Sequence, residues 1–328
     1  MSAAATPVLL AMSAPPYWHC GRTIRQTSLY MLAGLAPAII MSIWNWGLPA
    51  ARVMALCVAT AVLTEALCQK AMGRELSVDD FTAVNSVRLL LVTSVALSLL
   101  LAFLLPAAAP WWLVMLGAFI AVTLGKMAFG GLGANPVNTP LVGWAVLFVS
   151  FPLLMDPNAM QLATDFADPL IRLKYFGPAA AESIPFTDLL LGKQIGGLGA
   201  TQVGALFLGG SFLAARGIIR WQISLGFFLG VVGLAALYNM LDPAVDASPF
   251  FHLCTGSVML GGFFLATETA NAPSRPLPMF IYGLMGGTLT IIIRKYGIYA
   301  DGTPFAILLV NLLTPFLDLI RPKPFGAR

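Results

Sequence analysis

Long apolar runs constrain this chain more than any other feature of its sequence. Of its 328 residues 59% are hydrophobic and only 10% are charged, whereas a soluble domain carries about 25% charged residues. A charge-poor run of about 20 residues crosses a bilayer as a helix, and backbone in lipid must be satisfied within a helix or a closed barrel. The runs are too long and too uniformly apolar for barrel strands. The sequence therefore predicts an all-α polytopic membrane protein.

We expect about ten transmembrane helices, of which the sixth is short and rich in glycine. They are predicted at Tyr30–Trp46, Val53–Cys68, Leu89–Leu105, Trp111–Phe129, Leu141–Met155, Gln202–Ala215, Ile223–Leu241, Phe250–Ala266, Met279–Ile293 and Pro304–Ile320. Ten spans place both termini on one side of the membrane. Twelve lysines and arginines fall on that side and six on the other, which predicts that both termini are cytoplasmic.

A polar stretch divides the expected helices into two groups of five. Residues 156–200 contain Asp165, Asp168, Glu182 and Asp188 and no apolar run of spanning length. The predicted organisation is a cytoplasmic N-terminal segment (1–29), a first five-helix membrane repeat (30–155), an extracytoplasmic polar insert (156–200), a second five-helix repeat (201–320) and a cytoplasmic tail (321–328).

The two groups of helices resemble each other. Leu99–Ala102 reads Leu-Leu-Leu-Ala and recurs as Phe263–Ala266, and a glycine-containing turn precedes the last span of each half. An odd number of helices per repeat gives the halves opposite orientations, and inverted repeats of this kind form a central site at their interface. The alternative is that two apolar stretches look alike without any repeat.

The turn Gly196–Thr201 is the first candidate site. Its sequence is Gly-Gly-Leu-Gly-Ala-Thr, and it leads into the sixth expected span. Glycines let backbone amides turn towards a ligand, and free N–H groups at a helix start favour phosphate. No Lys-Ser/Thr follows, so the turn is not a nucleotide-binding P-loop. A phosphate could instead esterify the hydroxyl of Thr201; the alternative is a flexible turn with a capping threonine.

The segment Gly130–Pro140 is the second candidate site. Glycine, asparagine and proline between two spans indicate irregular backbone near membrane depth, which is tolerated where it is buried in protein or lines a cavity. Its expected counterpart in the second half is Gly297–Gly302. A plain tight turn is the alternative.

Five ionisable residues lie in or near the apolar runs, and such groups usually face a bundle interior. Glu65 lies deepest in its run and is the best candidate for a functional group. We expect His252, Glu268 and Asp318 to reach the membrane surface from the ends of their spans; the fifth residue is Lys126.

The sequence shows no pattern typical of nucleic-acid binding, of a metal site or of hydrolytic catalysis. The basic residues are scattered, which argues against nucleic acid, and the four cysteines lack metal-ligand spacing. No hydrolytic triad or pair of catalytic carboxylates is recognisable. The sequence therefore assigns no catalytic residue and no metal site.

Several blocks in order resemble the RnfD/NqrB family of membrane subunits. They are Phe129–Pro136, Met259–Thr267, Ile293–Gly297, Asp301–Gly302 and Phe305–Asn311. The likeness covers nearly the whole chain, and the short N-terminus is more similar to RnfD than to NqrB. The resemblance implies a subunit of an ion-translocating oxidoreductase (translocase) in the bacterial cytoplasmic membrane. That complex passes electrons between ferredoxin and NAD and moves H⁺ or Na⁺, and its subunits are not expected to be active alone.

The resemblance also implies a cofactor. Members of the family carry FMN joined through its phosphate to the last residue of an Asp-x-x-Ser/Thr-Gly-Ala-Thr motif. Gly199, Ala200 and Thr201 match that motif, which makes Thr201 the expected attachment site, whereas Ile195 and Leu198 stand at its acidic and hydroxyl positions. The family can hold a second, non-covalent flavin, riboflavin. The implied partners are flavin and iron–sulfur subunits of the Rnf-type complex and a flavin transferase.

Three functions follow from these observations. The first is electron transfer through FMN on Thr201, because the chain itself has no iron–sulfur or nicotinamide pattern. The second is an inverted-repeat channel or carrier for an ion or small solute without a redox role. The third is a structural scaffold, which does not require broken helices.

Overall fold

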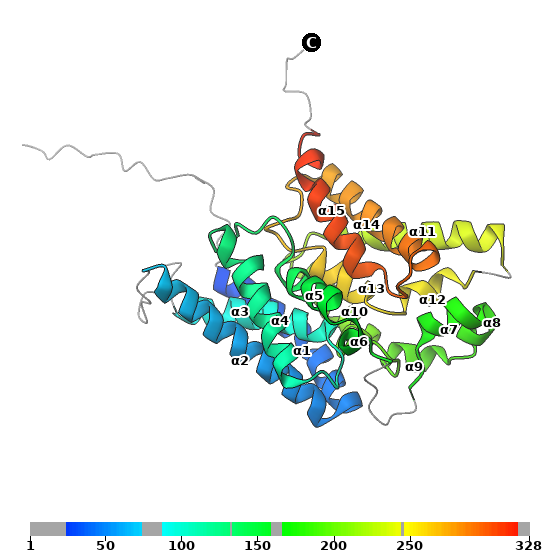
Figure 1. The fold of residues 1–328 in the computed structure, drawn as a ribbon. Helices are drawn as coiled ribbons and strands as arrows, with labels where there is room; N and C mark the ends of the chain where they lie inside the picture. Colours follow the sequence, from blue (N-terminus) through cyan, green and yellow to red (C-terminus); the bar gives the residue numbers. More distant parts are fainter. Residues whose placement is uncertain (1–23, 74–86, 132, 159–165, 244–245, 321–328) are drawn as a thin grey trace, which may run out of the picture.

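The chain folds into a bundle of helices, as the apolar runs predict. The structure, a computed structural model, describes residues 24–73, 87–131, 133–158, 166–243 and 246–320 (Figure 1). Within these ranges the regular structure is helical apart from one isolated bridge between Ala167 and Gln194. The all-α class is therefore confirmed.

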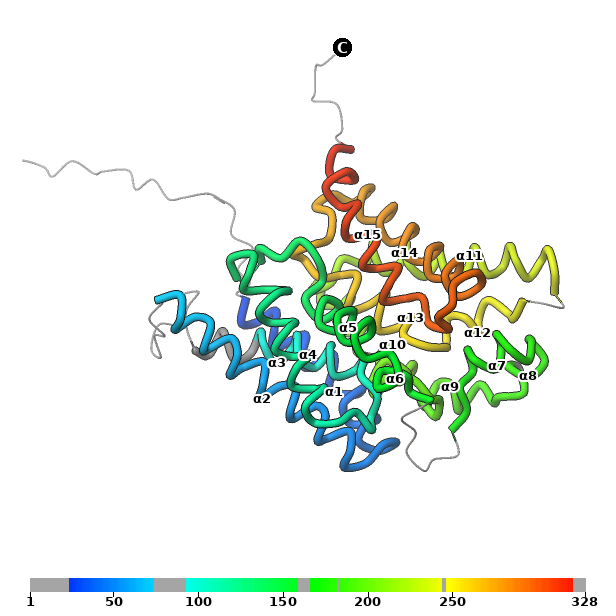
Figure 2. The backbone as a smooth tube through the Cα atoms, viewed as in Figure 1, coloured from blue at the N-terminus to red at the C-terminus, as the bar shows by residue number. Residues whose placement is uncertain are grey.

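The first half of the bundle contains five apolar helices and two short ones. They are α1 (Ile24–Trp46), α2 (Leu48–Ala71), α3 (Val87–Leu104), α4 (Trp111–Gly125), a 3₁₀ turn (Met127–Phe129), α5 (Thr139–Ser150) and α6 (Pro152–Met155). Prolines stand in the first turns of α2 and α5, where the missing N–H costs nothing. Helix α2 packs against both α3 and α4, and α4 against α5 (Figure 2).

In its described part, the polar insert forms three short helices at one edge of the bundle (Figure 1). They are α7 (Pro169–Phe176), α8 (Pro178–Glu182) and α9 (Phe186–Leu190). Asp168 caps α7 by accepting the backbone N–H groups of Leu170 and Ile171, both at 3.0 Å.

The second half begins with α10 (Val203–Ala215) and α11 (Trp221–Leu241) and ends with α14 (Pro276–Tyr296) and α15 (Thr303–Leu317). Between them, the expected span Phe250–Ala266 is divided into α12 (Pro249–Leu253), α13 (Val258–Leu260) and a π-helical turn (Gly261–Leu265). The break coincides with Gly256, whose φ of 64° belongs to the left-handed region. A single continuous eighth helix is therefore a wrong expectation.

Five helices are long and apolar enough to cross a membrane in the described part of the chain. They are α1, α2, α4 with its 3₁₀ turn, α11 and α14, and shorter apolar helices span Thr93–Leu104, Thr139–Ser150, Val203–Ala215 and Thr303–Leu317. The chain is thus a multi-pass membrane protein, while ten spans in two inverted repeats stay a prediction. The predicted division into segments is untested, and residues 1–23, Asp165 and the tail 321–328 lie outside the described residues.

Helices α11 and α14 lie side by side because glycines remove the side chains between them (Figure 1). Gly226 and Gly230 on α11 face Gly283 and Gly287 on α14: an added Cβ at Gly287 would lie 2.1 Å from the carbonyl oxygen of Phe227. Small residues four apart are the usual means of close helix packing in lipid, where no hydrophobic effect drives association.

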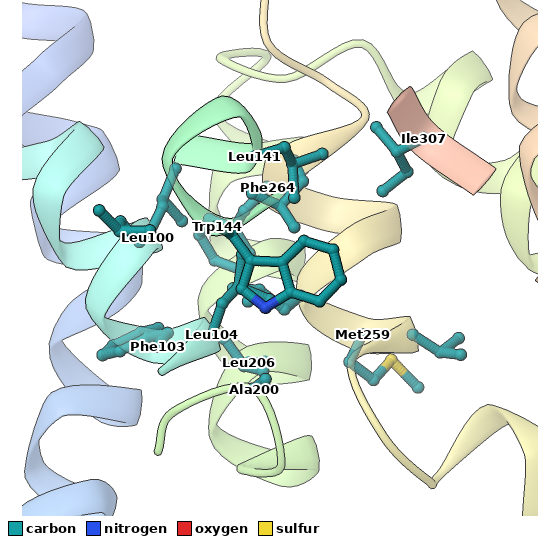
Figure 3. Packing of buried hydrophobic residues seen from close by; sticks show 14 of the residues in the cluster. Leu100, Phe103, Leu104, Leu141, Trp144, Ala200, Leu206, Met259, Phe264 and Ile307 are labelled. Carbon is teal, nitrogen blue, oxygen red and sulfur yellow. The ribbon is translucent and has the colours of Figure 1, made fainter. Parts of the chain in front are cut away.

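The core lies where the two halves meet. Trp144 of α5 is 6% exposed and stands among side chains of α3 and of the second half, including Leu104 and Met259 (Figure 3). Helices α1 and α10 also cross between halves, at Gly34 and Gly209. Each half therefore depends on the other for burial of its apolar residues.

Candidate functional site

The turn Gly196–Thr201 lies against the end of α3. The backbone N–H of Leu198 donates to the carbonyl of Leu105 at 2.9 Å, and those of Gly199 and Ala200 donate to the carbonyl of Phe103 at 3.2 and 3.0 Å. These bonds satisfy carbonyls that a helix end leaves without partners. The amides of residues 198–200 are therefore engaged within the protein, so they do not face a ligand as we expected.

Packing against Phe103 also explains two of the glycines. A Cβ at Gly197 would lie 2.6 Å from the Phe103 carbonyl oxygen, and a Cβ at Gly199 would lie 2.2 Å from the Phe103 ring. Neither approach is compatible with a larger side chain. The partner segment lies about a hundred residues away in sequence, so the pattern alone offered no signal of this contact.

Thr201 is held inside this turn. Its side chain is fully buried, and its hydroxyl donates to the Gly197 carbonyl at 3.3 Å. Its own carbonyl accepts from Nε2 of Gln194 at 3.2 Å. The hydroxyl is reached from outside only if the turn opens and this bond to Gly197 breaks.

A cavity of about 380 Å³ adjoins the outer wall of the turn. Gly196, Gly197 and Ala200 line one side of it, and the rings of Phe148 and Tyr299 line another. These two rings meet edge to face with centroids 4.7 Å apart. The volume is that of a small-molecule site, and a planar aromatic ligand suits such a wall.

Three aspartates line the cavity, Asp156, Asp168 and Asp301, and the last two have opposite electrostatic surroundings. Burial raises the pKa of Asp168 above its usual range, although Asn158 and the N–H groups that begin α7 donate to it. Burial alone would also raise the pKa of Asp301, but Arg294 and the hydrogen bonds from Ser257 and Thr303 outweigh it and hold this pKa below its usual range. Both groups line the cavity.

The cavity beside the turn has the size of a small-molecule site, and Thr201, the expected flavin attachment residue, is not among the residues that line it. The two positions that depart from the family motif are both apolar: Leu198 is fully buried, while Ile195 is 8% exposed and lines the cavity. Gly196, Gly197 and Ala200 are the residues that would lie next to the flavin, with Thr201 behind them.

Glu65 belongs to a buried ion pair inside the first half. Its Oε1 lies 2.5 Å from Nζ of Lys126 at the end of α4, and both side chains are almost completely buried. The hydroxyl of Ser94 on α3 donates to the other carboxylate oxygen. The expectation that Glu65 faces the bundle interior is confirmed, and the structure supplies its partner.

The segment Gly130–Pro140 connects the two halves. Nδ2 of Asn135 donates to Oε1 of Glu268 at 3.1 Å, and Nδ2 of Asn138 donates to the Leu265 carbonyl at 3.0 Å. Asn138 also caps α5. The segment is buried in protein at these residues, as irregular backbone near membrane depth requires.

Two buried polar residues, His252 and Arg294, lie at the break between α12 and α13, and His252 does not follow the sequence-based expectation. His252 is 6% exposed and does not reach the surface from a span end. Arg294 is equally buried and bridges three elements: it donates to the carbonyls of His252 and Thr255 and pairs with Asp301 at 3.2 Å. The break between α12 and α13 frees these carbonyls, which explains why the cation lies there.

The comparisons with known proteins agree along nearly the full chain. The model of the NQR2, RnfD, RnfE family matches residues 11–326. A subunit of the Na⁺-translocating ferredoxin:NAD⁺ oxidoreductase complex of Acetobacterium woodii is 34% identical over 94% of this chain and 92% of its own. A subunit of the ion-translocating oxidoreductase complex of Alcanivorax borkumensis is 35% identical over 94% of each chain.

Proposed function

The chain belongs to the NQR2, RnfD, RnfE family, and from this membership we propose that it is the flavin-carrying, RnfD-type subunit of an ion-translocating oxidoreductase complex. Its relatives in such complexes match it over more than nine-tenths of their length. The complex passes electrons between ferredoxin and NAD and couples this to movement of H⁺ or Na⁺. The chain works within the complex, because its own residues bring no iron–sulfur or nicotinamide pattern.

The single observation that carries the flavin proposal is the cavity beside the turn Gly196–Thr201. FMN, esterified through its phosphate to Thr201, supplies electron transfer when bound. The cavity is lined by the aromatic residues Phe148 and Tyr299 and by the small residues Gly197 and Ala200, a combination that suits a planar aromatic ring. For esterification, the Thr201 hydroxyl must first release its hydrogen bond to the Gly197 carbonyl, so that the flavin transferase can reach it.

The membrane architecture of the proposal is two inverted five-helix repeats with both termini in the cytoplasm of a bacterium. In each half the second apolar helix packs on the fourth, α2 on α4 and α11 on α14. This matched packing supports the repeat.

The buried pair Glu65–Lys126 supports a role in ion movement. Ionisable groups inside a membrane bundle are costly and usually functional. Glu65 on α2 accepts from Ser94 on α3 and pairs with Lys126 at the end of α4, so a change in its charge would alter contacts among three helices.

The partners in the complex are flavin and iron–sulfur subunits, and a second non-covalent flavin (riboflavin) completes the proposed electron path.

The test of the covalent flavin is in-gel fluorescence and intact-mass analysis of the chain purified from a host with its flavin transferase. We expect an adduct of FMN minus water in the wild type and in Thr187→Ala, which removes an exposed hydroxyl of the same insert. Thr201→Ala should carry none. An adduct that survives Thr201→Ala, or a wild type without any, would falsify the assignment.

A second experiment addresses the altered motif. Replacing Ile195 by Asp and Leu198 by Thr restores the acidic and hydroxyl positions, and we expect the flavinylated fraction to rise above that of the wild type.

The alternative function, a channel or carrier without redox chemistry, predicts solute uptake by the flavin-free chain in liposomes. Uptake that is equal in wild type and Thr201→Ala would favour this alternative.

A further inference from the structure

A second, smaller cavity lies beside the proposed flavin cavity. Its volume is about 150 Å³, and it shares Leu170, Lys174 and Ala300 with its larger neighbour. Its other walls come from α11, α12 and the end of α14. The flavin proposal does not use it.

Positive charge predominates in this cavity. Lys174, Arg294 and Lys295 line it together with a single acidic residue, Asp246. Asp246 is matched by Lys295, whose Nζ lies 2.6 Å from its carboxylate, and Arg294 is matched by Asp301. No carboxylate of the described residues forms an ion pair with Lys174, and burial lowers its pKa. Among the described residues, Lys174 is thus the lining cation that lacks a counterion.

Lys174 is nevertheless held in place. Its Nζ donates to the carbonyls of Gly297 and Ile298 at 2.5 and 2.6 Å, which fixes the ammonium at the end of α14. An ammonium has three donors, so one remains for a ligand. A fixed cation binds an anion without first losing side-chain freedom.

Two buried polar atoms of the lining residues also have no partner in the described part of the chain. They are Nδ1 of His252 and Nε of Arg294, each in a side chain of a residue that is 6% exposed. A buried polar atom without a partner destabilises a fold, because it has lost its hydrogen bonds to water. His252 and Arg294 both line the cavity, so an anion bound there would lie next to the residues that carry these unpaired atoms.

The surrounding surface suits the edge of a membrane. Tyr175, Phe176, Tyr296 and Ile298 next to the cavity are between 68% and 85% exposed. Exposed aromatic residues at a helix end are typical of the membrane interface, where lipid phosphates lie. A phosphate in this cavity can therefore come from water or from a lipid.

We propose that the cavity formed by Lys174, His252, Arg294 and Lys295 binds a phosphate group, either free or as the headgroup of an anionic phospholipid. Phosphate matches the observed set of donors because it accepts several hydrogen bonds on separate oxygens and its charge pairs with the lysine and arginine.

The first arm of the test measures binding of radiolabelled inorganic phosphate to the purified full chain in detergent. We expect saturable binding near one phosphate per chain, and at least tenfold weaker binding in Lys174→Gln. Lys193→Gln is the matched control, because Lys193 is an exposed lysine of the same insert, paired with Asp188 and outside the cavity. His252→Asn gives an independent test of the site if Lys174→Gln lowers the yield of folded protein.

The second arm separates the two sources. The chain is reconstituted in nanodiscs of phosphatidylcholine with a minor fraction of phosphatidylglycerol, extracted gently, and its retained lipids are quantified. Enrichment of phosphatidylglycerol that Lys174→Gln abolishes indicates a headgroup, whereas binding in the phosphate arm alone indicates a free anion. Equal phosphate binding and equal lipid retention in wild type, Lys174→Gln and His252→Asn overturn the proposal.

Discussion

Two ion pairs among the described residues, Glu65–Lys126 and Arg294–Asp301, differ in how much else supports their charges. Glu65–Lys126 lies inside the first half with both side chains at most 3% exposed. Arg294–Asp301 lies at the end of α14, where Asp301 is 29% exposed and Arg294 also donates to two carbonyls. The first pair has one further described donor, the Ser94 hydroxyl, while the second is part of a larger hydrogen-bonded network that includes backbone carbonyls. Buried charge is therefore stabilised here in two ways: by an oppositely charged side chain at Glu65–Lys126, and by backbone carbonyls as well as a carboxylate at Arg294.

Breaking the inner pair should have the largest effect. Lys126→Met leaves the Glu65 carboxylate with Ser94 as its remaining described donor, and removal of one partner of a buried pair costs about 3–5 kcal/mol. We expect a large drop in the thermal unfolding midpoint in detergent. The double variant Glu65→Leu with Lys126→Met should regain much of the loss, because no charge is then left buried. Equal stability of Lys126→Met and wild type would contradict this account.

Breaking the outer pair should cost less. Asp301→Asn removes the counterion of Arg294 but leaves its bonds to the carbonyls of His252 and Thr255, so we expect a loss of about 1.5–3 kcal/mol, the size of one charged hydrogen bond. The pKa of Asp301 is lowered in the folded chain. Its contribution is therefore present above the unfolded pKa of about 3.9 and is lost as the pH falls through the folded pKa.

The measurement is the unfolding midpoint between pH 3 and 7. The difference between wild type and Asp301→Asn should shrink as the pH falls below about 4. A difference that stays constant across this range would mean that the hydrogen bonds of Asp301, and not its charge, support the site.

Asp168 sharpens the comparison because it is a buried carboxyl without a cationic partner in the described residues. Its pKa is raised, so its contribution is present below the unfolded pKa and is lost as the pH rises through the folded pKa, opposite in sign to Asp301. Asp168→Asn keeps a good helix cap and should match or exceed wild-type stability at pH 7, whereas Asp168→Ala loses about 1 kcal/mol with the cap. A destabilised Asp168→Asn at pH 7 would show that the carboxylate has a stabilising partner.

The sequence predicted elements better than contacts. Apolar runs located nine of the ten expected segments as single main helices, because length and hydrophobicity are local properties. The exception, Phe250–Ala266, breaks where Arg294 binds carbonyls, and this cation comes from a helix some forty residues later. Hydropathy is averaged over neighbouring residues, so it cannot predict a contact between segments that are far apart in the sequence.

The candidate site shows the same limit. Glu65 was recognised from its depth in an apolar run, but its partner Lys126 follows only from the packing of α2 on α4. The glycines of Gly196–Thr201 suggested amides free for phosphate, yet their neighbour is Phe103. The role of Thr201 rests on family resemblance, and nothing in its local pattern distinguishes a buried hydroxyl from an exposed one.

The exposed ion pair Lys193–Asp188 should contribute least of these pairs to the free energy of unfolding. The charged atoms lie 3.4 Å apart, but the side chains are 47% and 36% exposed, so water and salt screen the attraction. We expect Lys193→Gln to change the free energy of unfolding by less than about 0.5 kcal/mol at moderate salt. The measurement is the unfolding midpoint in low and high salt. A loss as large as that of Asp301→Asn would mean that depth does not govern the strength of these pairs, and the contrast between the inner and outer pairs would then need another cause.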